Sequence, residues 1–188
     1  MTVRQADWLW PLRDATPLFP DAPGRFAAVR RHDIHTGVDL YCEVGQEVVA
    51  VEDGTVFYVE NFTGPNADDP SPWWNDTQAV MVRGASGTVV YGEVESLVEA
   101  GDTVRRGQVI AVVRRSVLKR FKGRPTVMLH FELMTGDAPE TLWWKLGEPQ
   151  SPYLLNPESK LVDTAGGRLR HFDLAEYDGE SFRDRAGE

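Results

Sequence analysis

Two stretches of the chain, residues 44–56 and 100–112, share one pattern of apolar positions in which valine and isoleucine runs are interrupted by glycine. Valine and isoleucine favour strands. Both stretches carry a Gly-x-x-Val scheme, and their glycines suit turns that need a positive φ, at Gly45, Gly54, Gly101 and Gly107. We therefore predict two related β-modules, each made of a strand, a glycine-centred turn and a second strand.

A further strand is predicted around residues 128–133, with one apolar and one largely polar face. Successive side chains of a strand point to opposite faces. The apolar face, which we expect to pack in the core, consists of Leu129, Phe131 and Leu133. The opposite face carries Met128, His130 and Glu132.

Residues 61–76 are rich in Pro, Asn and Asp and predict a long loop, with Trp73 and Trp74 at its far end. Exposed aromatic side chains there would suit a substrate groove, and core packing fits one of the pair equally well. A second pair, Trp143 and Trp144, falls in a predicted short helix, and we expect this pair to pack against the sheet rather than to contact a ligand.

The candidate chemistry lies in His35-Thr36-Gly37-Val38-Asp39 together with His130. Two imidazoles and one carboxylate form a typical catalytic zinc site, which leaves a fourth position for water or substrate. A His-x-x-x-Asp spacing alone is more often a hydrogen-bonded pair in a loop than a metal site. The assignment of a metal site therefore depends on the surrounding motifs.

Those motifs resemble the lysostaphin-type zinc endopeptidase family in order and spacing. The matching segments are His35-x-Gly-x-Asp39, Gly45-x-x-Val48-x-Ala50-x-x-x-Gly54-x-Val56, Tyr91-Gly92, Gly101-x-x-Val104-x-x-Gly107-Gln108-x-Ile110 and Leu129-His130-Phe131-Glu132. The resemblance covers roughly residues 8–162. It implies a mainly β fold, a duplicated hybrid-motif β-sandwich or barrel-like sheet with short helices and long loops. It also implies Zn²⁺ bound by His35, Asp39 and His130, and a peptide or peptidoglycan-type ligand, for which Tyr91, Trp73 and Trp74 are candidate binding residues.

The chain departs from that family at two positions. The family has Tyr-x-His-Leu where this chain has Tyr91-Gly92-Glu93-Val94, and His-Leu-His-Phe-Glu where it has Met128-Leu129-His130-Phe131-Glu132. Both missing histidines form the family's catalytic pair. A thioether cannot act as a general base or donate a proton, so Met128 replaces neither role and is expected to fill space.

Three roles stay open for Glu93: a general base, a fourth zinc ligand, or a solvated surface glutamate. Two functions follow. One is a zinc-dependent peptidase or amide hydrolase that uses Glu93. The other is a zinc-binding but inactive relative that recognises a peptide or glycopeptide, or regulates a partner protein. With both imidazoles absent, we expect little or no cleavage of glycine-rich or peptidoglycan-derived peptides.

Composition limits the possible domain organisation and the classes of partner. The 188 residues are 41% hydrophobic and 26% charged, as expected for one globular domain, here residues 1–162, followed by a polar, acid-rich tail at 163–188 for which partial disorder is one expectation. We expect no metal ligand at His171 in that tail. A net charge of −9 argues against a nucleic-acid partner, and the single Cys42 is expected to be a buried filler.

The sequence contains no transmembrane run, and its first eight residues lack the apolar stretch of a signal peptide. The chain as it stands is therefore expected in the cytoplasm, without a membrane partner. Action on a cell wall would then require lysis or another export route. The sequence leaves the oligomeric state open.

Overall fold

Strands dominate the computed structural model, which describes residues 8–186. Strands make up 36% and helices 9% of the structure, against about 20–25% strand in an average soluble protein. The predicted mainly β fold is confirmed. The expected lack of a signal peptide concerns the first eight residues, of which 1–7 lie outside the described residues, as do residues 187–188 at the end of the predicted tail.

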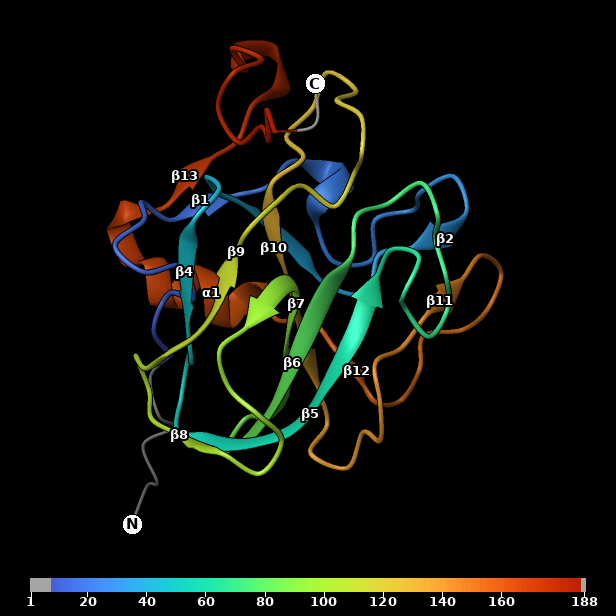
Figure 1. Ribbon diagram of the computed structural model, residues 1–188. Coiled ribbons are helices and arrows are strands. Elements are labelled where there is room, and N and C mark those ends of the chain that lie inside the picture. The colour runs from blue at the N-terminus through green and yellow to red at the C-terminus, as the bar shows by residue number, and fades with distance from the viewer. Residues whose placement is uncertain (1–7, 187–188) are drawn as a thin grey trace.

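Nine strands form the main sheet, in which all neighbours are antiparallel (Figure 1). They are β3 (Val38–Tyr41), β4 (Gln46–Val49), β5 (Gly54–Thr63), β6 (Thr77–Gly84), β7 (Gly87–Ser96), β8 (Thr103–Val104), β9 (Val109–Val113), β10 (Met128–Met134) and β12 (Leu154–Leu155). The path runs β12-β10-β7-β6-β5-β8, with β3 added on β10 and β9 joining β7 to β4.

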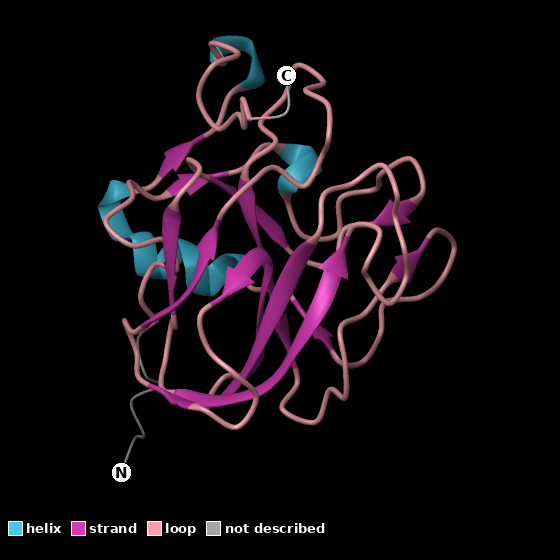
Figure 2. Cartoon of the chain, viewed as in Figure 1, coloured by secondary structure: helices cyan, strands magenta, loops and turns pink. Residues whose placement is uncertain are grey.

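Small elements surround this sheet (Figure 2). Two-residue strands pair as β1 (Leu18–Phe19) with β13 (Arg170–His171), and as β2 (Asp33–Ile34) with β11 (Trp144–Lys145). The helices are α1 (Glu158–Ala165) and the 3₁₀ turns η1 (Ala22–Gly24), η2 (Gly166–Arg168) and η3 (Leu174–Glu176). Helix α1 packs on the core through Leu161 and Ala165.

The two predicted β-modules interlock through their strands. The first strand of the first module, β4, pairs with the second strand of the other module, β9, and β5 pairs with β8 through Gly54↔Val104 and Thr55↔Thr103. Each module thus completes the other's pairing.

Glycine has two different uses in these modules. Gly45, Gly101 and Gly107 adopt φ values of 91°, 99° and 84°, as the turn prediction requires. Gly54 does not have a positive φ, and the prediction is wrong there. A Cβ on Gly54 would lie 2.5 Å from the carbonyl oxygen of Arg83, so glycine is needed because β5 and β6 approach closely.

The predicted faces of β10 are confirmed on the core side. Leu129, Phe131 and Leu133 belong to the main hydrophobic cluster, and Trp8 meets the Phe131 ring edge to face at 5.5 Å. Cys42 is 3% exposed within the same cluster, so it is the expected buried filler.

Two local predictions need correction. The loop begins after Thr63, because β5 continues through residues 61–63. Residues 139–144 are not helical: Trp144 starts β11 opposite Ile34 and packs on Phe26 at 6.1 Å, whereas Trp143 is 59% exposed. The two tryptophans point different ways because neighbouring residues of an extended segment alternate in direction.

The C-terminal segment lies against the body of the protein. The carbonyl of Phe182 accepts hydrogen bonds from the backbone amides of Thr126 and Val127, and Tyr41 packs against Phe172 at 4.9 Å. His171 is exposed. The division into a domain and a tail stays a prediction. Among the described residues, no helix has both the length and the apolar character needed to cross a bilayer.

Candidate metal centre

Strand pairing brings two of the three predicted ligands together. β10 lies between β3 and β7, and His130 is directly opposite Asp39 on β3. Residues opposite each other in an antiparallel pair project to the same face. Since Val38, Leu40, Leu129 and Phe131 fill the core on the other face, Asp39 and His130 share the outer face.

His35 reaches the same point from the segment that precedes β3. Its backbone is fixed by two hydrogen bonds, from Ala27 N to His35 O and from His35 N to Ala28 O, both 2.9 Å. Its Nε2 lies 3.0 Å from Asp39 Oδ1 and 3.1 Å from His130 Nδ1. The distance between His130 Nδ1 and Asp39 Oδ1 is also 3.1 Å. Three ligand atoms therefore form a nearly equilateral triangle.

Neighbouring acceptors set the tautomers of both imidazoles. The carbonyl of Arg25 lies 2.9 Å from His35 Nδ1, and Glu132 Oε1 lies 2.8 Å from His130 Nε2. Both neighbours can only accept, so these nitrogens carry the protons. When each ring loses its second proton to bind a metal, the lone pairs at His35 Nε2 and His130 Nδ1 therefore face Asp39, an arrangement typical of metal-binding histidines.

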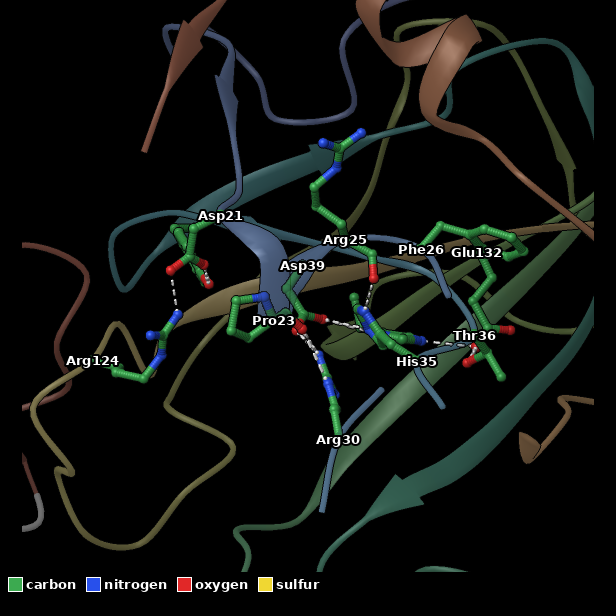
Figure 3. Close-up of polar contacts among 12 residues, drawn as sticks. Asp21, Pro23, Arg25, Phe26, Arg30, His35, Thr36, Asp39, Arg124 and Glu132 are labelled. Carbon is green, nitrogen blue, oxygen red and sulfur yellow. Dashed lines mark hydrogen bonds and ion pairs between the residues drawn. The ribbon is translucent and has the colours of Figure 1, made fainter. Parts of the chain in front are cut away.

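The supporting residues approach from several segments (Figure 3). Arg30 binds Asp39 Oδ2 and the carbonyl of Pro23, and the hydroxyl of Thr36 donates to Glu132. By occupying Oδ2, Arg30 leaves Oδ1 as the ligand atom of Asp39. None of these three contacts follows from motif spacing, so neither Arg30 nor the role of Glu132 was predicted from the sequence.

The electrostatics of the cluster favour a cation. Burial alone would raise the pKa of Asp39, yet the charges of His35 and Arg30 and hydrogen bonds from His130 and His35 hold it well below its usual range. Burial lowers the pKa of His130, but its hydrogen bonds to Asp39 and Glu132 outweigh this and raise the pKa to about 10. A buried imidazole that retains its proton so strongly marks a position of negative potential.

These residues fit zinc. Tetrahedral coordination with bonds of about 2.0–2.1 Å places ligand atoms about 3.3 Å apart, close to the 3.0–3.1 Å edges of the triangle. Two nitrogens and one carboxylate oxygen are also a ligand set that zinc prefers. Within the described residues, His35, Asp39 and His130 are the group whose ligand atoms lie within 4.8 Å of one another.

Glu93 lies beside this cluster because of a bulge. Val80 pairs with Tyr91 and Gln78 with Val94, so β7 carries one extra residue at Gly92-Glu93. Glu93 has φ 64°, which is uncommon outside glycine. Bulges break the alternation of a strand and redirect side chains. Here the bulge lets Glu93 face the same cavity as His130.

One oxygen of the Glu93 carboxyl is shielded from solvent, although the residue as a whole is half-buried. Its Oε2 is buried and has no hydrogen-bond partner among the described residues, so it is not a solvated surface group. Burial and the charge of Asp39 raise the pKa of Glu93 to about 8, against the opposing charges of His130 and Arg30. Strongly shifted carboxyls in a cavity are candidates for acid–base chemistry.

Met128 is 9% exposed and lies opposite Tyr41 in the β3–β10 pair. The buried position agrees with a side chain that fills space. It supplies no donor or charge to the ligand cluster.

The cluster opens into a cavity of about 750 Å³, whose lining includes Trp73, Trp74 and Trp143. Tyr91, a predicted substrate-binding residue, is not part of that lining. Tyr91 is 1% exposed, its ring packs on Phe131 at 5.5 Å, and its hydroxyl accepts a hydrogen bond from Val51 N. It is therefore a core residue, because it lies on the inner face of β7, just before the bulge.

The fold and the site agree with the sequence comparison. The model of peptidase family M23 matches residues 33–141, more than half of the chain, and the chain belongs to that family. The protein is thus an M23, lysostaphin-type, peptidase-like domain. No curated protein matches the chain.

Solved structures similar to this chain include a zinc-containing peptidase from Vibrio cholerae, with 24% identity over 67% of this chain and 36% of that one, and a TM-score of 0.47. Helicobacter pylori Csd3 is 19% identical over 75% of this chain and 35% of that one, with a TM-score of 0.46. The chain spans only about a third of the length of these proteins.

Gly37, in the ligand motif, provides a test of how closely its segment packs against β10. A Cβ on Gly37 would lie 2.5 Å from Phe131 O and 2.9 Å from Glu132 Cγ. Gly37→Ala is therefore expected to lower the free energy of unfolding by about 1–3 kcal/mol, measured by urea or thermal unfolding. Gly167→Ala is the matched control, because a Cβ there meets no atom within 4 Å. Equal stability of the two variants would contradict the close contact.

Proposed function

We propose that this domain binds one zinc ion through His35, Asp39 and His130 and hydrolyses a peptide-type amide bond with Glu93 as general base. One observation carries the proposal: the carboxyl of Glu93, whose Oε2 is buried and unpartnered among the described residues, faces the same cavity as the ligand cluster and has its pKa raised to about 8. A peptide, including one from peptidoglycan, is the proposed substrate class.

Zinc held by these ligands would polarise the substrate carbonyl and lower the pKa of the attacking water. Glu93 would accept the proton of that water and return it to the leaving amine. A general base works best when its pKa is near the working pH, and a pKa of about 8 meets that condition. Positive charge at the cluster would shift Glu93 further toward its carboxylate form.

The geometry favours a base over a fourth ligand. Glu93 is not among the residues whose ligand atoms lie within 4.8 Å of one another. A carboxylate beside the cluster, but outside it, can bond to a water without displacing it.

The expected turnover is slow. Met128 offers no stabilisation for negative charge on the attacked carbonyl, and loss of one such donor typically costs about a hundredfold to a thousandfold in rate. The lack of a charge-stabilising group at Met128 also favours the second candidate, an inactive relative that binds a peptide or regulates a partner protein. The zinc-loaded chain should therefore be assayed on purified cell-wall fragments and on mixed short peptides. Slow, zinc-dependent cleavage supports hydrolysis, and complete absence of cleavage supports the second candidate.

Zinc binding at pH 7 is expected to release at least about one proton per chain, because His130, with its pKa of about 10, must lose its proton to become a ligand, and the shift of Glu93 toward its carboxylate form adds to the release. The apparent zinc affinity should rise as the pH increases toward 10. Calorimetric titration in two buffers of different ionisation enthalpy measures the released protons. Binding with no proton release and no pH dependence between about pH 6 and 9 would contradict the assignment of His130.

The metal-free protein should lose stability as the pH rises. The pKa of His130 is raised from 6.5 to about 10 and that of Glu93 from 4.5 to about 8, so the folded state holds both protons more tightly than the unfolded state. The contribution of His130 is complete below pH 6.5 and disappears toward pH 10, and that of Glu93 disappears between pH 4.5 and 8. Thermal unfolding of chelator-treated protein across this range checks the direction. A Tm that rises with pH would contradict it.

A further inference from the structure

The cavity beside the ligand cluster has an aromatic wall for which hydrolysis alone gives no reason. Trp73 is 73% exposed and Trp143 is 59% exposed, and both line the cavity. A cluster of solvent-exposed, large apolar side chains around one cavity marks a binding surface. The remaining question is which chemical group they would hold.

Both tryptophans stand on anchored backbone. Trp143 lies between Thr141, whose hydroxyl donates to Glu60 at 2.7 Å, and Trp144, which pairs with Ile34. The loop that carries Trp73 is tied at its base, where Asn66 donates twice to the carboxylate of Asp76 and the Ser71 hydroxyl accepts from Gly64 N. Such pre-positioned walls reduce the entropy lost on binding.

Acidic residues line the cavity with these rings. Glu60 is half-buried, and its pKa is raised by burial and then, against the hydrogen bond from Thr141, by the charges of Asp68, Glu132 and Glu140. Glu60, Asp68 and Glu132 all line the cavity. These carboxyls repel one another, and an incoming cation would relieve that repulsion.

Glu132 supplies an independent sign of an unfilled acceptor. It is 1% exposed, and its Oε1 is bonded to Thr36 and His130. Its Oε2 is buried with no hydrogen-bond partner among the described residues. A buried carboxylate oxygen without a partner is costly, and a donor that enters the cavity would remove this cost.

We propose that this part of the cavity binds the cationic side chain of a peptide, a lysine-type primary ammonium. Its aliphatic stem would lie along Trp73 and Trp143, and its ammonium would face Glu60 and Asp68. The rings would cover the apolar stem of such a side chain, and the two carboxylates would attract its charged end. Two arginines, Arg30 and Arg31, also line the cavity, and Arg30 is already paired with Asp39. The inference rests on the proposed function, because this peptide would be the substrate whose amide reaches the cluster.

The test is binding of capped pentapeptides Gly-Gly-X-Gly-Gly to the full, zinc-loaded chain, measured by calorimetry, with lysine, norleucine or glutamate at X. We expect lysine to bind about tenfold more tightly than norleucine, and glutamate to bind most weakly. The double variant Glu60→Gln with Asp68→Asn should bring lysine to the level of norleucine. Trp73→Ala should weaken both. Glu176→Gln removes an exposed carboxylate on η3 and should change neither.

Equal binding of lysine and norleucine, a preference for glutamate, or a lysine preference that survives in the double variant would each overturn the inference. Peptide binding can be measured without turnover, so the proposal of lysine binding and the proposal of hydrolysis can be rejected independently. Lysine-selective binding without any cleavage would leave this inference standing and reject hydrolysis. Cleavage without lysine selectivity would do the reverse.

Discussion

His130→Ala is expected to lower zinc affinity by more than about a hundredfold. Loss of a residue that only supports a metal ligand typically costs tenfold to a hundredfold, and His130 is proposed to bind the metal itself through Nδ1, which lies 3.1 Å from both His35 Nε2 and Asp39 Oδ1. His35→Ala and Asp39→Ala should have comparable effects. Competition with a chromophoric zinc chelator measures all three.

His171→Ala is the matched control, because His171 is an exposed histidine on β13. It should bind zinc like the unmodified chain. Glu132→Gln should fall between the two, with a loss of about tenfold to a hundredfold, because it weakens the hydrogen bonds of Glu132 to His130 Nε2 and to Thr36 but removes no metal ligand. Unchanged zinc affinity in His130→Ala would reject the site.

Glu93→Gln should abolish the slow turnover while zinc binding is retained. The amide keeps the size of the side chain but cannot accept the proton of the attacking water, and general bases contribute about 10²–10⁴-fold in rate. Turnover on short peptides and zinc content are measured on the same preparation. If Glu93→Gln instead loses zinc, Glu93 is a fourth ligand, and if neither quantity changes, it takes no part.

The double variant Met128→His with Glu93→His supplies the two imidazoles that the family resemblance predicts at these positions. It should cleave cell-wall peptides faster than the unmodified chain if the cavity still admits such peptides. Rapid turnover by the unmodified chain would show that the missing imidazoles are not needed. Absence of cleavage by both the unmodified chain and the double variant would indicate a cavity adapted to a different ligand.

Much of the fold could be predicted because local pattern and pairing agree. The repeated Gly-x-x-Val scheme predicted two β-modules, and alternation in β10 placed Leu129, Phe131 and Leu133 in the core. The same alternation placed His130 on the outer face. The ligand triad was predicted from a motif, and the structure brings its three atoms together.

What could not be predicted depends on irregular backbone and on contacts between distant segments. The bulge that redirects Glu93 requires knowledge of how β6 and β7 pair. Arg30 and Glu132 act through contacts with residues 9 and 96 positions away, Asp39 and Thr36. Tyr91 and Trp143 were misplaced for a related reason, since exposure depends on which neighbour covers a ring and not on residue type.

The most direct test of the central claim is a crystal structure with anomalous scattering recorded on both sides of the zinc absorption edge. We expect one strong zinc peak bound by His35 Nε2, Asp39 Oδ1 and His130 Nδ1, in protein purified without added metal or loaded at neutral pH. A zinc-loaded crystal with no peak among these three atoms, or with its zinc bound elsewhere, would contradict it.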